Sequence, residues 1–310
     1  MVFLGTAEFA VPSLRALVQV GERVSLVVTQ PDRPKGRGRT LEPTPVKAEA
    51  LRLGLPVFQP ERLAAPEAVA RLAEHAPEFL AVVAYGQLLR REVLDLPRRG
   101  AVNLHPSLLP RHRGPSPVAW TLLQGDAEGG NTTMLLDEGM DSGPLLLQEA
   151  QPVSPEQTRG DLETCLARSG AELLVRSLAG VRQGVLTPRK QNPDEATFSG
   201  LITRELRTIP WHQPALQVRG RVHALSPTPG AACRCGSRLL KVLRVAEAEG
   251  TGEPGEVVRH DPQGPVVACG GGALVLTEVQ PEGRRAMTGA EYLRGGGAPL
   301  DTRLEPGWDG

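Results

Sequence analysis

Apolar and polar residues alternate along the first half of the chain in a pattern that predicts strands separated by helices. Helical spacing of apolar residues is present at 9–20, within 41–53 and at 67–75. Short apolar runs, typical of strands buried on both faces, occur at 1–4, 24–29, 56–58, 79–84 and 101–104. This alternation predicts a doubly wound, Rossmann-like α/β sheet.

The second half of the chain changes character after a long amphipathic helix expected at 158–180. Two further strands are expected before it, at 132–137 and 144–153, and a segment rich in proline and polar residues follows it at 186–200. Short alternating pieces separated by Gly/Pro turns then predict a small β-barrel or sandwich with helices at 201–206 and 213–223. The last residues, from 294, are expected to be loosely ordered.

Length and composition add limits to this picture. The 310 residues suffice for two domains, and we expect a first domain at 1–185, a linker at 186–203 and a smaller domain at 204–310. The 35 basic and 35 acidic residues balance, so any contact with nucleic acid has to come from a local basic patch. Four scattered cysteines, no signal peptide and no apolar run of membrane length predict a reduced, cytoplasmic protein.

The strand ending in AVNLHP carries the first candidate chemistry. Asn103 and His105 stand two residues apart, so their side chains point to the same face of the strand. Pro106 removes a hydrogen-bond donor and ends the strand, and ligands of open α/β sheets bind just beyond such strand ends. The pair is therefore placed to donate hydrogen bonds to an oxygen that gains negative charge.

The loop DEGMDSG at 137–143 offers a carboxylate to accompany this pair. Asp137 or Asp141 near His105 would favour the protonated ring and fix its orientation. A structural role is the simpler alternative, because polar groups at strand ends are often satisfied locally and aspartates in glycine-rich loops often form turns. From the residues alone, the chain is an α/β enzyme with an Asn/His/Asp cluster.

Two other chemistries fit the same residues less well. Ser107, His105 and Asp141 could form a hydrolase triad, but Ser107 lacks the Gly-x-Ser-x-Gly turn and lies only two residues from its base. A Mg²⁺ site at Asp137, Glu138 and Asp141 is conceivable, although no phosphate-binding glycine loop accompanies it.

The motifs NLHPSLLPRHRG and DEGMDSG together resemble the signature of the 10-formyltetrahydrofolate-dependent formyltransferases. That signature runs Asn-x-His, Ser-Leu-Leu-Pro-x-x-Arg-Gly and then Gly-x-Asp-Ser/Thr-Gly. Four further segments, FLGTAEFAVPSL, VVTQPDRPKGRGR, PTPVKAEA and LPVFQP, are similar to the members of this family that formylate methionyl-tRNA.

The resemblance implies roles for individual residues. Asn103, His105 and Asp141 match the catalytic residues, which stabilise the oxyanion formed when the amino group of methionyl-tRNA attacks the formyl group of 10-formyltetrahydrofolate. No metal is implied. The co-substrate would contact two sets of residues: Ser107, Leu108, Leu109 and Pro110, and Tyr85, Gly86, Gln87 and Leu88.

The resemblance also implies how the RNA is held. The loop PDRPKGRGR is cationic and has no apolar residue to bury, so it could equally be a solvated surface loop. In the family this loop reaches the acceptor end of the tRNA, and the matching positions are Arg33, Lys35, Arg37 and Arg39. The smaller domain would be an OB-like barrel that binds the initiator tRNA, and the protein is expected to act as a monomer.

Three functions therefore compete. The first is formyl transfer to the methionine of initiator methionyl-tRNA for translation initiation. The second is formylation of a small amine, or hydrolysis of formyl-folate, which the basic loop disfavours. The third is a non-catalytic RNA-binding protein, which the complete Asn/His/Asp set disfavours.

Overall fold

The computed structural model of the chain describes residues 1–35 and 40–307 and divides them into two compact units. The first unit comprises Met1–Gly114, Gly129–Gln151 and Glu163–Phe198, and the second comprises Pro115–Glu128, Pro152–Leu162 and the chain from Ser199 onward. No helix within these described residues is long and apolar enough to cross a membrane.

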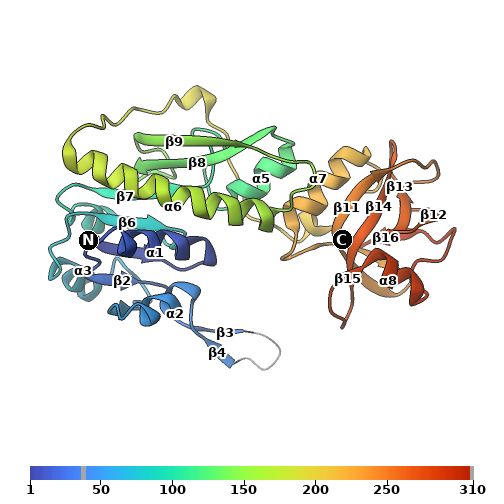
Figure 1. Cartoon of the computed structure of the whole chain (residues 1–310), viewed down its shortest axis with the longest axis horizontal. Helices are drawn as coiled ribbons and strands as arrows, with labels where there is room; N and C mark the ends of the chain where they lie inside the picture. The colour runs from blue at the N-terminus through green and yellow to red at the C-terminus, as the bar shows by residue number, and fades with distance from the viewer. Residues whose placement is uncertain (36–39, 308–310) are drawn as a thin grey trace. The chain divides into compact units, whose positions relative to one another are not determined.

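Within the described residues, a seven-stranded sheet forms the centre of the first unit, in the order β5-β2-β1-β6-β7-β8-β9 (Figure 1). The strands are β1 (Val2–Gly5), β2 (Leu26–Val28), β5 (Val57–Phe58), β6 (Leu80–Val83), β7 (Ala101–His105), β8 (Glu128–Leu135) and β9 (Leu145–Pro152). Strands β5, β2, β1, β6 and β7 pair in parallel, and β8 pairs antiparallel with β7. The predicted doubly wound α/β sheet is confirmed.

Helices cover both faces of this sheet because successive residues of the buried strands point to opposite faces. One core joins Phe3, Ala81 and Leu104 to α1 (Val11–Gln19), α2 (Pro45–Arg52) and α6 (Arg159–Gln183). The other joins Leu4 and Val82 to α3 (Pro66–Ala73) and α4 (Arg91–Leu94). Short 3-10 helices occur at Glu8–Ala10 and Pro193–Glu195.

A two-stranded hairpin, β3 (Arg33–Lys35) with β4 (Thr40–Glu42), leaves the first unit between β2 and α2. The sequence pattern did not reveal it, because the strands are short and carry no alternating apolar face. The antiparallel pairing of Arg33 with Glu42 and of Pro34 with Leu41 defines its register.

The second unit is built on an antiparallel sheet in the order β12-β13-β14-β11-β10-β16, with β15 paired to β14. Its described strands are β10 (Ala231–Cys235), β11 (Arg238–Ala248), β12 (Val257–Asp261), β13 (Gly264–Ala268), β14 (Ala273–Pro281), β15 (Met287–Thr288) and β16 (Leu304–Pro306). Its helices are α5 (Pro117–Gln124), α7 (Ala215–Leu225), α8 (Gly289–Arg294) and the 3-10 turn at Glu205–Arg207. Side chains of α7 and of the strands share one apolar core.

Residues 115–128 pack with the second unit, a grouping that sequence proximity to the first domain did not suggest. Helix α5 lies against α7, and a Cβ at Gly220 would stand 3.0 Å from the carbonyl oxygen of Leu122. Glycine is therefore what permits this close approach of the two helices.

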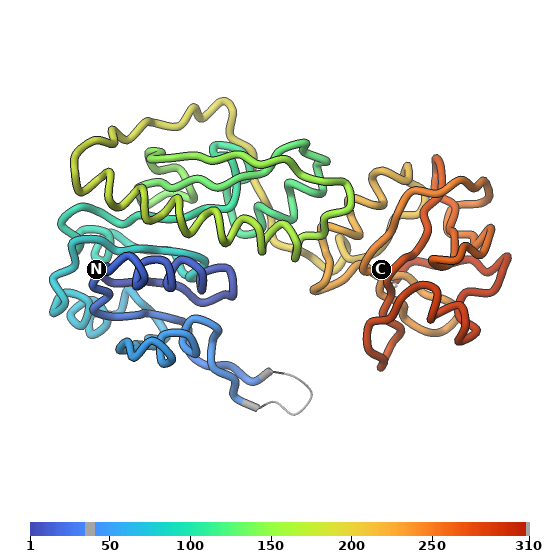
Figure 2. The backbone as a smooth tube through the Cα atoms, viewed as in Figure 1, coloured from blue at the N-terminus to red at the C-terminus, as the bar shows by residue number. Residues whose placement is uncertain are grey.

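The expected linker at 186–203 lies mostly along the first unit. Figure 2 shows the chain after α6 returning beside β9, and Arg189 and Leu145 exchange two backbone hydrogen bonds there, of 2.9 and 2.8 Å. Further along, the Arg113 amide donates to the carbonyl of Thr197 at 2.9 Å. Proline and polar residues marked this segment as irregular, but its backbone hydrogen bonds hold it against the sheet.

Two expectations about local structure were wrong. The helix at 201–206 is reduced to the single turn Glu205–Arg207. Of its first two apolar residues, Ile202 packs against the core, whereas Leu201 is exposed and gains nothing from helical packing. The end of the chain is not loosely ordered through residue 307, since β16 pairs with β10 and the side chains of Ala298 and Leu304 are buried in the core.

His223 gives the second unit a specific sensitivity to acid. Its Nδ1 donates to the Pro155 carbonyl (3.1 Å) and its Nε2 accepts from the Val245 amide (3.3 Å), which requires the neutral ring. Burial lowers the pKa of His223 from 6.5 to about 4.

We predict that the stability contributed by neutral His223 is complete above pH 6.5 and is lost as pH falls toward 4. Because the unfolded state binds the proton more tightly, up to about 3 kcal/mol of unfolding free energy is lost over this window. Thermal unfolding of the wild type and His223→Gln from pH 8 to 4 measures it. Parallel pH profiles for the two proteins would contradict the prediction.

Candidate active site

Strand β7 presents Asn103 and His105 on the face of the sheet opposite to α6. Val102 and Leu104 pack into the core that contains Leu174 and Leu178 of α6, so the alternating residues point away from that helix. Both polar side chains are nevertheless largely buried, with Asn103 9 % and His105 5 % exposed. The same-face placement predicted from the sequence is therefore found.

The ring of His105 lies between two oxygen acceptors. Its Nε2 is 3.0 Å from the backbone carbonyl of His112, and its Nδ1 is 3.7 Å from Oδ2 of Asp141. The first is a hydrogen bond that Nε2 has to donate, and the second is an ion-pair distance beyond hydrogen-bond length. Both neighbours of the ring are therefore oxygen acceptors, one on each nitrogen side.

Asp141 reaches His105 from the loop between β8 and β9. Its Oδ2 also accepts the backbone amide of Gly114 at 2.8 Å, so a single carboxylate oxygen contacts both the His105 ring and the turn that follows β7. Asp141 adopts a left-handed backbone conformation, with φ of 50°, which is unusual for a residue other than glycine.

The side-chain amide of Asn103 has no hydrogen-bond partner among the residues that the structure describes. Buried amide groups are rarely left unpaired, because losing water without a replacement costs about 1–3 kcal/mol. Neither polar atom of Asn103 is among the fully enclosed orphan atoms, so the group can be reached from outside. An accessible unpaired donor beside His105 is what a ligand oxygen would require.

The turn that carries Ser107–Pro110 is held together by its own polar groups. Ser107 donates through its hydroxyl to the carbonyl of Arg111 (2.7 Å). The hydroxyl of Thr132 on β8 donates to the Ser107 carbonyl (2.6 Å) and accepts the Leu109 amide (3.1 Å). Gln148 of β9 donates to the Leu109 carbonyl (2.7 Å). Ser107 and Leu109 are buried, and their role as co-substrate contacts stays a prediction.

The loop after β6 places its four expected residues in different environments. Tyr85 is buried in the core and its hydroxyl has no partner, and burial raises its pKa to about 12. Gly86 has φ of 88°, and Gln87 uses its amide to accept the Leu63 N–H (2.9 Å) and donate to the Glu61 carbonyl (3.0 Å). Leu88 is 67 % exposed and is thus the residue with the most surface free for a ligand.

The basic loop is described only at its base. Arg37 and Arg39 lie outside the described residues, as does the side chain of Lys35, whereas Arg33 is exposed on β3. Next to it, Asp32 pairs with Nζ of Lys47 and accepts Gln59 Nε2 at 2.7 Å. These two hydrogen bonds lower the pKa of Asp32, so its carboxylate is held by Lys47 and Gln59.

The two alternative chemistries lose support from the geometry. Ser107 and His105 make their hydrogen bonds to the carbonyls of Arg111 and His112, so no bond joins them as a nucleophile and base. Asp137 accepts the Gly139 amide and the Ser142 hydroxyl, which is turn chemistry. Among the described residues, no group of three or more His, Cys, Asp or Glu is arranged to hold a metal ion.

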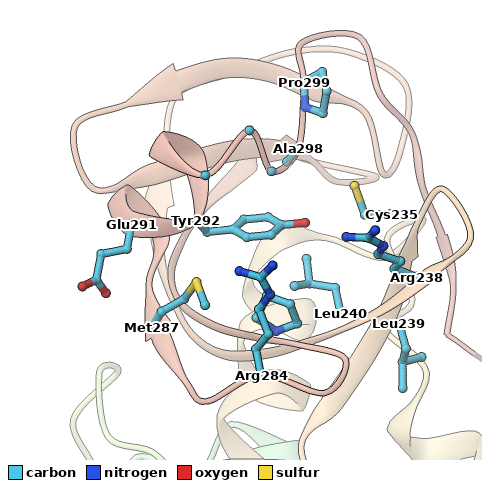
Figure 3. A pocket seen from close by; sticks show the side chains of 14 residues that line it. Cys235, Arg238, Leu239, Leu240, Arg284, Met287, Glu291, Tyr292, Ala298 and Pro299 are labelled. Atoms are coloured by element: carbon cyan, nitrogen blue, oxygen red, sulfur yellow. The ribbon is translucent and has the colours of Figure 1, made fainter.

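A cavity of about 260 Å³ opens in the second unit, far along the sequence from the motifs (Figure 3). Arg238, Arg284, Met287 and Tyr292 line it together with the glycines at 295–297. Within the described chain, neither arginine has an acidic partner. Burial raises the pKa of the Tyr292 hydroxyl, so the cavity combines an aromatic ring that stays neutral with two unpaired positive charges.

Several residues of the first site were not found from the sequence. The amide of Gln191 donates from Nε2 to the carbonyls of Asp141 and Gly143, both at 2.8 Å, and Gln191 Oε1 accepts from Arg113. Thr132 and His112 also belong to this group. The one local signal was Arg113, the arginine of the Arg-Gly pair that ends the NLHPSLLPRHRG motif. The structure shows that Arg113 is buried, at 8 % exposed, which is unusual for an arginine.

Family models match both halves of the chain. The model described as formyl transferase matches residues 1–178, and the model described as formyl transferase, C-terminal domain, matches residues 201–297. The chain belongs to the formyl transferase family.

Full-length relatives in this family are similar to the chain over nearly all of its residues. The methionyl-tRNA formyltransferase of Halorhodospira halophila is 47% identical over 309 residues, which cover 99% of this chain and 97% of the relative. The methionyl-tRNA formyltransferase of Geobacter sulfurreducens is 42% identical over 307 residues, which cover 99% of this chain and 95% of the relative.

Two solved structures share the fold at lower identity. HypX from Aquifex aeolicus, in complex with tetrahydrofolic acid, superposes with a TM-score of 0.66 at 18% identity, covering 94% of this chain and 46% of HypX. An N-formyltransferase from Helicobacter canadensis, in complex with folinic acid and dTDP-3-aminofucose, superposes with a TM-score of 0.65 at 13% identity. The match covers 89% of this chain and 99% of the N-formyltransferase.

We predict that Thr132→Val disrupts the turn that carries Ser107–Pro110. Valine matches threonine in shape but leaves the buried Leu109 amide and Ser107 carbonyl without the Thr132 hydroxyl. The expected loss of unfolding free energy is about 1–3 kcal/mol, as for a buried hydrogen-bonding group left unsatisfied. Chemical denaturation of the variant measures it, with Thr302→Val, at a half-buried position of the second unit, as the control. Equal stability of wild type and Thr132→Val would contradict the prediction.

Proposed function

We propose that the chain transfers the formyl group of 10-formyltetrahydrofolate to the α-amino group of methionine on initiator methionyl-tRNA. The observation that carries the proposal is the position of Asp141 Oδ2, 3.7 Å from His105 Nδ1, beside the unpaired Asn103 amide. Relatives at 40–47% identity over almost the whole chain are named methionyl-tRNA formyltransferase. The product would serve translation initiation. The enzyme would act in the cytoplasm as a monomer.

The proposed chemistry needs donors for an oxyanion and a path for one proton. When the amine attacks the formyl carbon, the formyl oxygen becomes negative, and the Asn103 amide would donate to it. His105 Nε2 already donates to the His112 carbonyl, so the second donor would be Nδ1. The amine loses a proton as the C–N bond forms, and the departing folate nitrogen gains one as the old C–N bond breaks.

Asp141 would act on this proton and on His105. Its carboxylate compensates the charge of the doubly protonated ring, and it is the only acidic group with an ion-pair distance to His105 among the described residues. It could accept the proton of the attacking amine and return it to the departing nitrogen. Side chains alone would carry out the charge compensation and the proton transfer, and no covalent enzyme intermediate would form.

The co-substrate would be held by loops at the same end of the sheet. The exposed Leu88 and the half-buried Leu108 and Pro110 offer apolar surface suited to a flat ring system. Ser107, Leu109 and Tyr85 are buried and would shape this surface from beneath, together with Gly86 and Gln87.

The tRNA would be held at two places. The hairpin β3–β4 carries the basic loop, whose Arg33, Lys35, Arg37 and Arg39 would contact phosphates. The antiparallel sheet of the second unit, which we take to be an OB-like barrel, would hold the rest of the RNA. Its cavity beside Arg238, Arg284 and Tyr292 suits a nucleotide, because an aromatic ring can stack on a base while guanidinium groups bind phosphate.

The reaction can be tested directly with purified protein. Wild type given 10-formyltetrahydrofolate and methionyl-initiator tRNA should form formyl-methionyl-tRNA, with little product from elongator tRNA or free methionine. Asn103→Ala and His105→Ala should each lower kcat by about 100- to 1,000-fold, the cost of removing one oxyanion donor. Asp141→Ala should lower kcat by about 100-fold or more, because it removes the proton acceptor and the charge partner of His105. Formylation of free amines only, or hydrolysis of formyl-folate without transfer, would reject the proposal.

The role of the cavity in the second unit has a matched control. Arg284 lines the cavity and its neighbour Arg285, on the same hairpin tip, does not. We predict that Tyr292→Leu weakens tRNA binding by about 1–3 kcal/mol, because the aromatic ring on which a base would stack is lost. Arg284→Ala should also weaken tRNA binding, and Arg285→Ala should have a smaller effect. Binding of labelled tRNA at several salt concentrations measures this. Equal losses for Arg284→Ala and Arg285→Ala would indicate a diffuse electrostatic contact instead.

A further inference from the structure

The segment expected as a linker brings one side chain to the active site. Arg189 is tied to the start of β9 by the two backbone hydrogen bonds with Leu145, and this fixes the position of Gln191 two residues later. Gln191 is half-buried and lies against the loop that carries Asp141.

Gln191 uses its full hydrogen-bonding capacity within the protein. The two N–H groups of Nε2 donate to the carbonyls of Asp141 and Gly143, both at 2.8 Å. Its Oε1 accepts from Nε and Nη2 of Arg113, at 3.1 and 2.8 Å. A primary amide offers two donors and one oxygen with two lone pairs, so two carbonyls on one side and a guanidinium on the other match glutamine.

The loop that Gln191 contacts adopts a conformation that needs such support. Asp141 has φ of 50°, and left-handed conformations are strained for residues other than glycine, so they persist where surrounding contacts hold them. At Gly143 a Cβ would lie 1.8 Å from the Leu135 carbonyl oxygen, so the loop folds tightly back on β8. Its backbone therefore has few alternatives that keep the carboxylate near His105.

The contacts of Gln191 close a ring of hydrogen bonds around the catalytic pair. His105 Nε2 bonds to the His112 carbonyl, Arg113 follows in sequence and bonds to Gln191, and Gln191 bonds to Asp141. The Asp141 carboxylate returns to Gly114 and faces His105. The turn after β7 and the loop after β8 are thus joined twice, once through the Asp141 side chain and once through Gln191.

We infer that Gln191 is a positioning residue that holds Asp141 at His105 for formyl transfer. This inference rests on the proposed function, because it assigns Gln191 a role in that reaction through Asp141. Gln191 contacts the backbone of the Asp141 loop, so its loss should act on the chemical step more than on the binding of either substrate.

The test compares two neighbouring amides that are each changed to a carboxylate. Gln191→Glu keeps an acceptor for Arg113 but cannot donate to the two carbonyls at neutral pH. Asn192→Asp adds the same charge at the next residue, where the exposed amide bonds to Glu195 and Asp194. We expect Gln191→Glu to lower kcat by about 10- to 100-fold, the cost of a displaced catalytic group, with KM for both substrates little changed. Asn192→Asp should behave as wild type.

Repeating the Gln191→Glu substitution in the Asp141→Ala variant separates a positioning role from a general effect on folding. In Asp141→Ala, where the positioned carboxylate is absent, Gln191→Glu should cause little further loss of kcat. If Gln191→Glu does not fold, Gln191→Asn, which shortens the side chain by one methylene, provides the same comparison.

The possible failures can be told apart. A wild type that forms no formyl-methionyl-tRNA rejects the proposed function itself. An active wild type with equal kcat for Gln191→Glu and Asn192→Asp rejects the role of Gln191. A rise in KM with unchanged kcat, or an undiminished loss in the Asp141→Ala background, rejects positioning through Asp141.

Discussion

The proposed chemistry depends on one constraint, which is that the carboxylate of Asp141 stays beside the ring of His105 although the two residues come from different loops. The gap of 3.7 Å is too long for a hydrogen bond to hold them together, so other contacts have to set it. The Gly114 amide fixes the carboxylate, and Gln191 fixes the backbone that carries it. The ion pair is therefore a consequence of hydrogen bonds made around it.

Strand β8 connects this arrangement to the rest of the fold. On one face, Asn131 donates to the Leu166 carbonyl of α6, and the hydroxyls of Thr133 and Ser177 meet at 2.6 Å. On the other face, Thr132 holds the turn that follows β7. Because successive side chains of a strand point to opposite faces, polar groups on both faces of β8 fix its position between α6 and the site. A displacement of α6 would therefore move the Ser107 turn as well.

The sequence was sufficient to predict the features that depend on the local pattern of residues. Continuous apolar runs identified the parallel strands, and the two-residue spacing of Asn103 and His105 was enough to place both side chains on one face of their strand. Asp141 could be proposed because a glycine-rich loop follows the next strand. The resemblance to a family was needed to identify the reaction, since the residues alone disfavoured a Ser107 triad and a Mg²⁺ site at Asp137 but led no further than an α/β enzyme with an Asn/His/Asp cluster.

What the sequence could not supply depends on contacts between distant residues. Gln191 lies 50 residues from Asp141, in a segment whose prolines suggested only a linker. In the sequence, Thr132 is an ordinary strand residue, and only the structure shows that its hydroxyl donates to the carbonyl of Ser107. Helix α5 is eight residues long and apolar nearly throughout, and the hairpin β3–β4 has no apolar face, so neither showed the periodicity by which such elements are recognised.

The most direct test of the central claim is a double-mutant cycle on the pair itself. Single-turnover formyl transfer would be measured for wild type, His105→Ala, Asp141→Ala and the double variant, with saturating substrates. If Asp141 acts through His105, the double variant should be about as slow as the slower single variant, as is found for catalytic groups that work as a unit. Rate losses that multiply would show that the two residues act independently and would contradict this account.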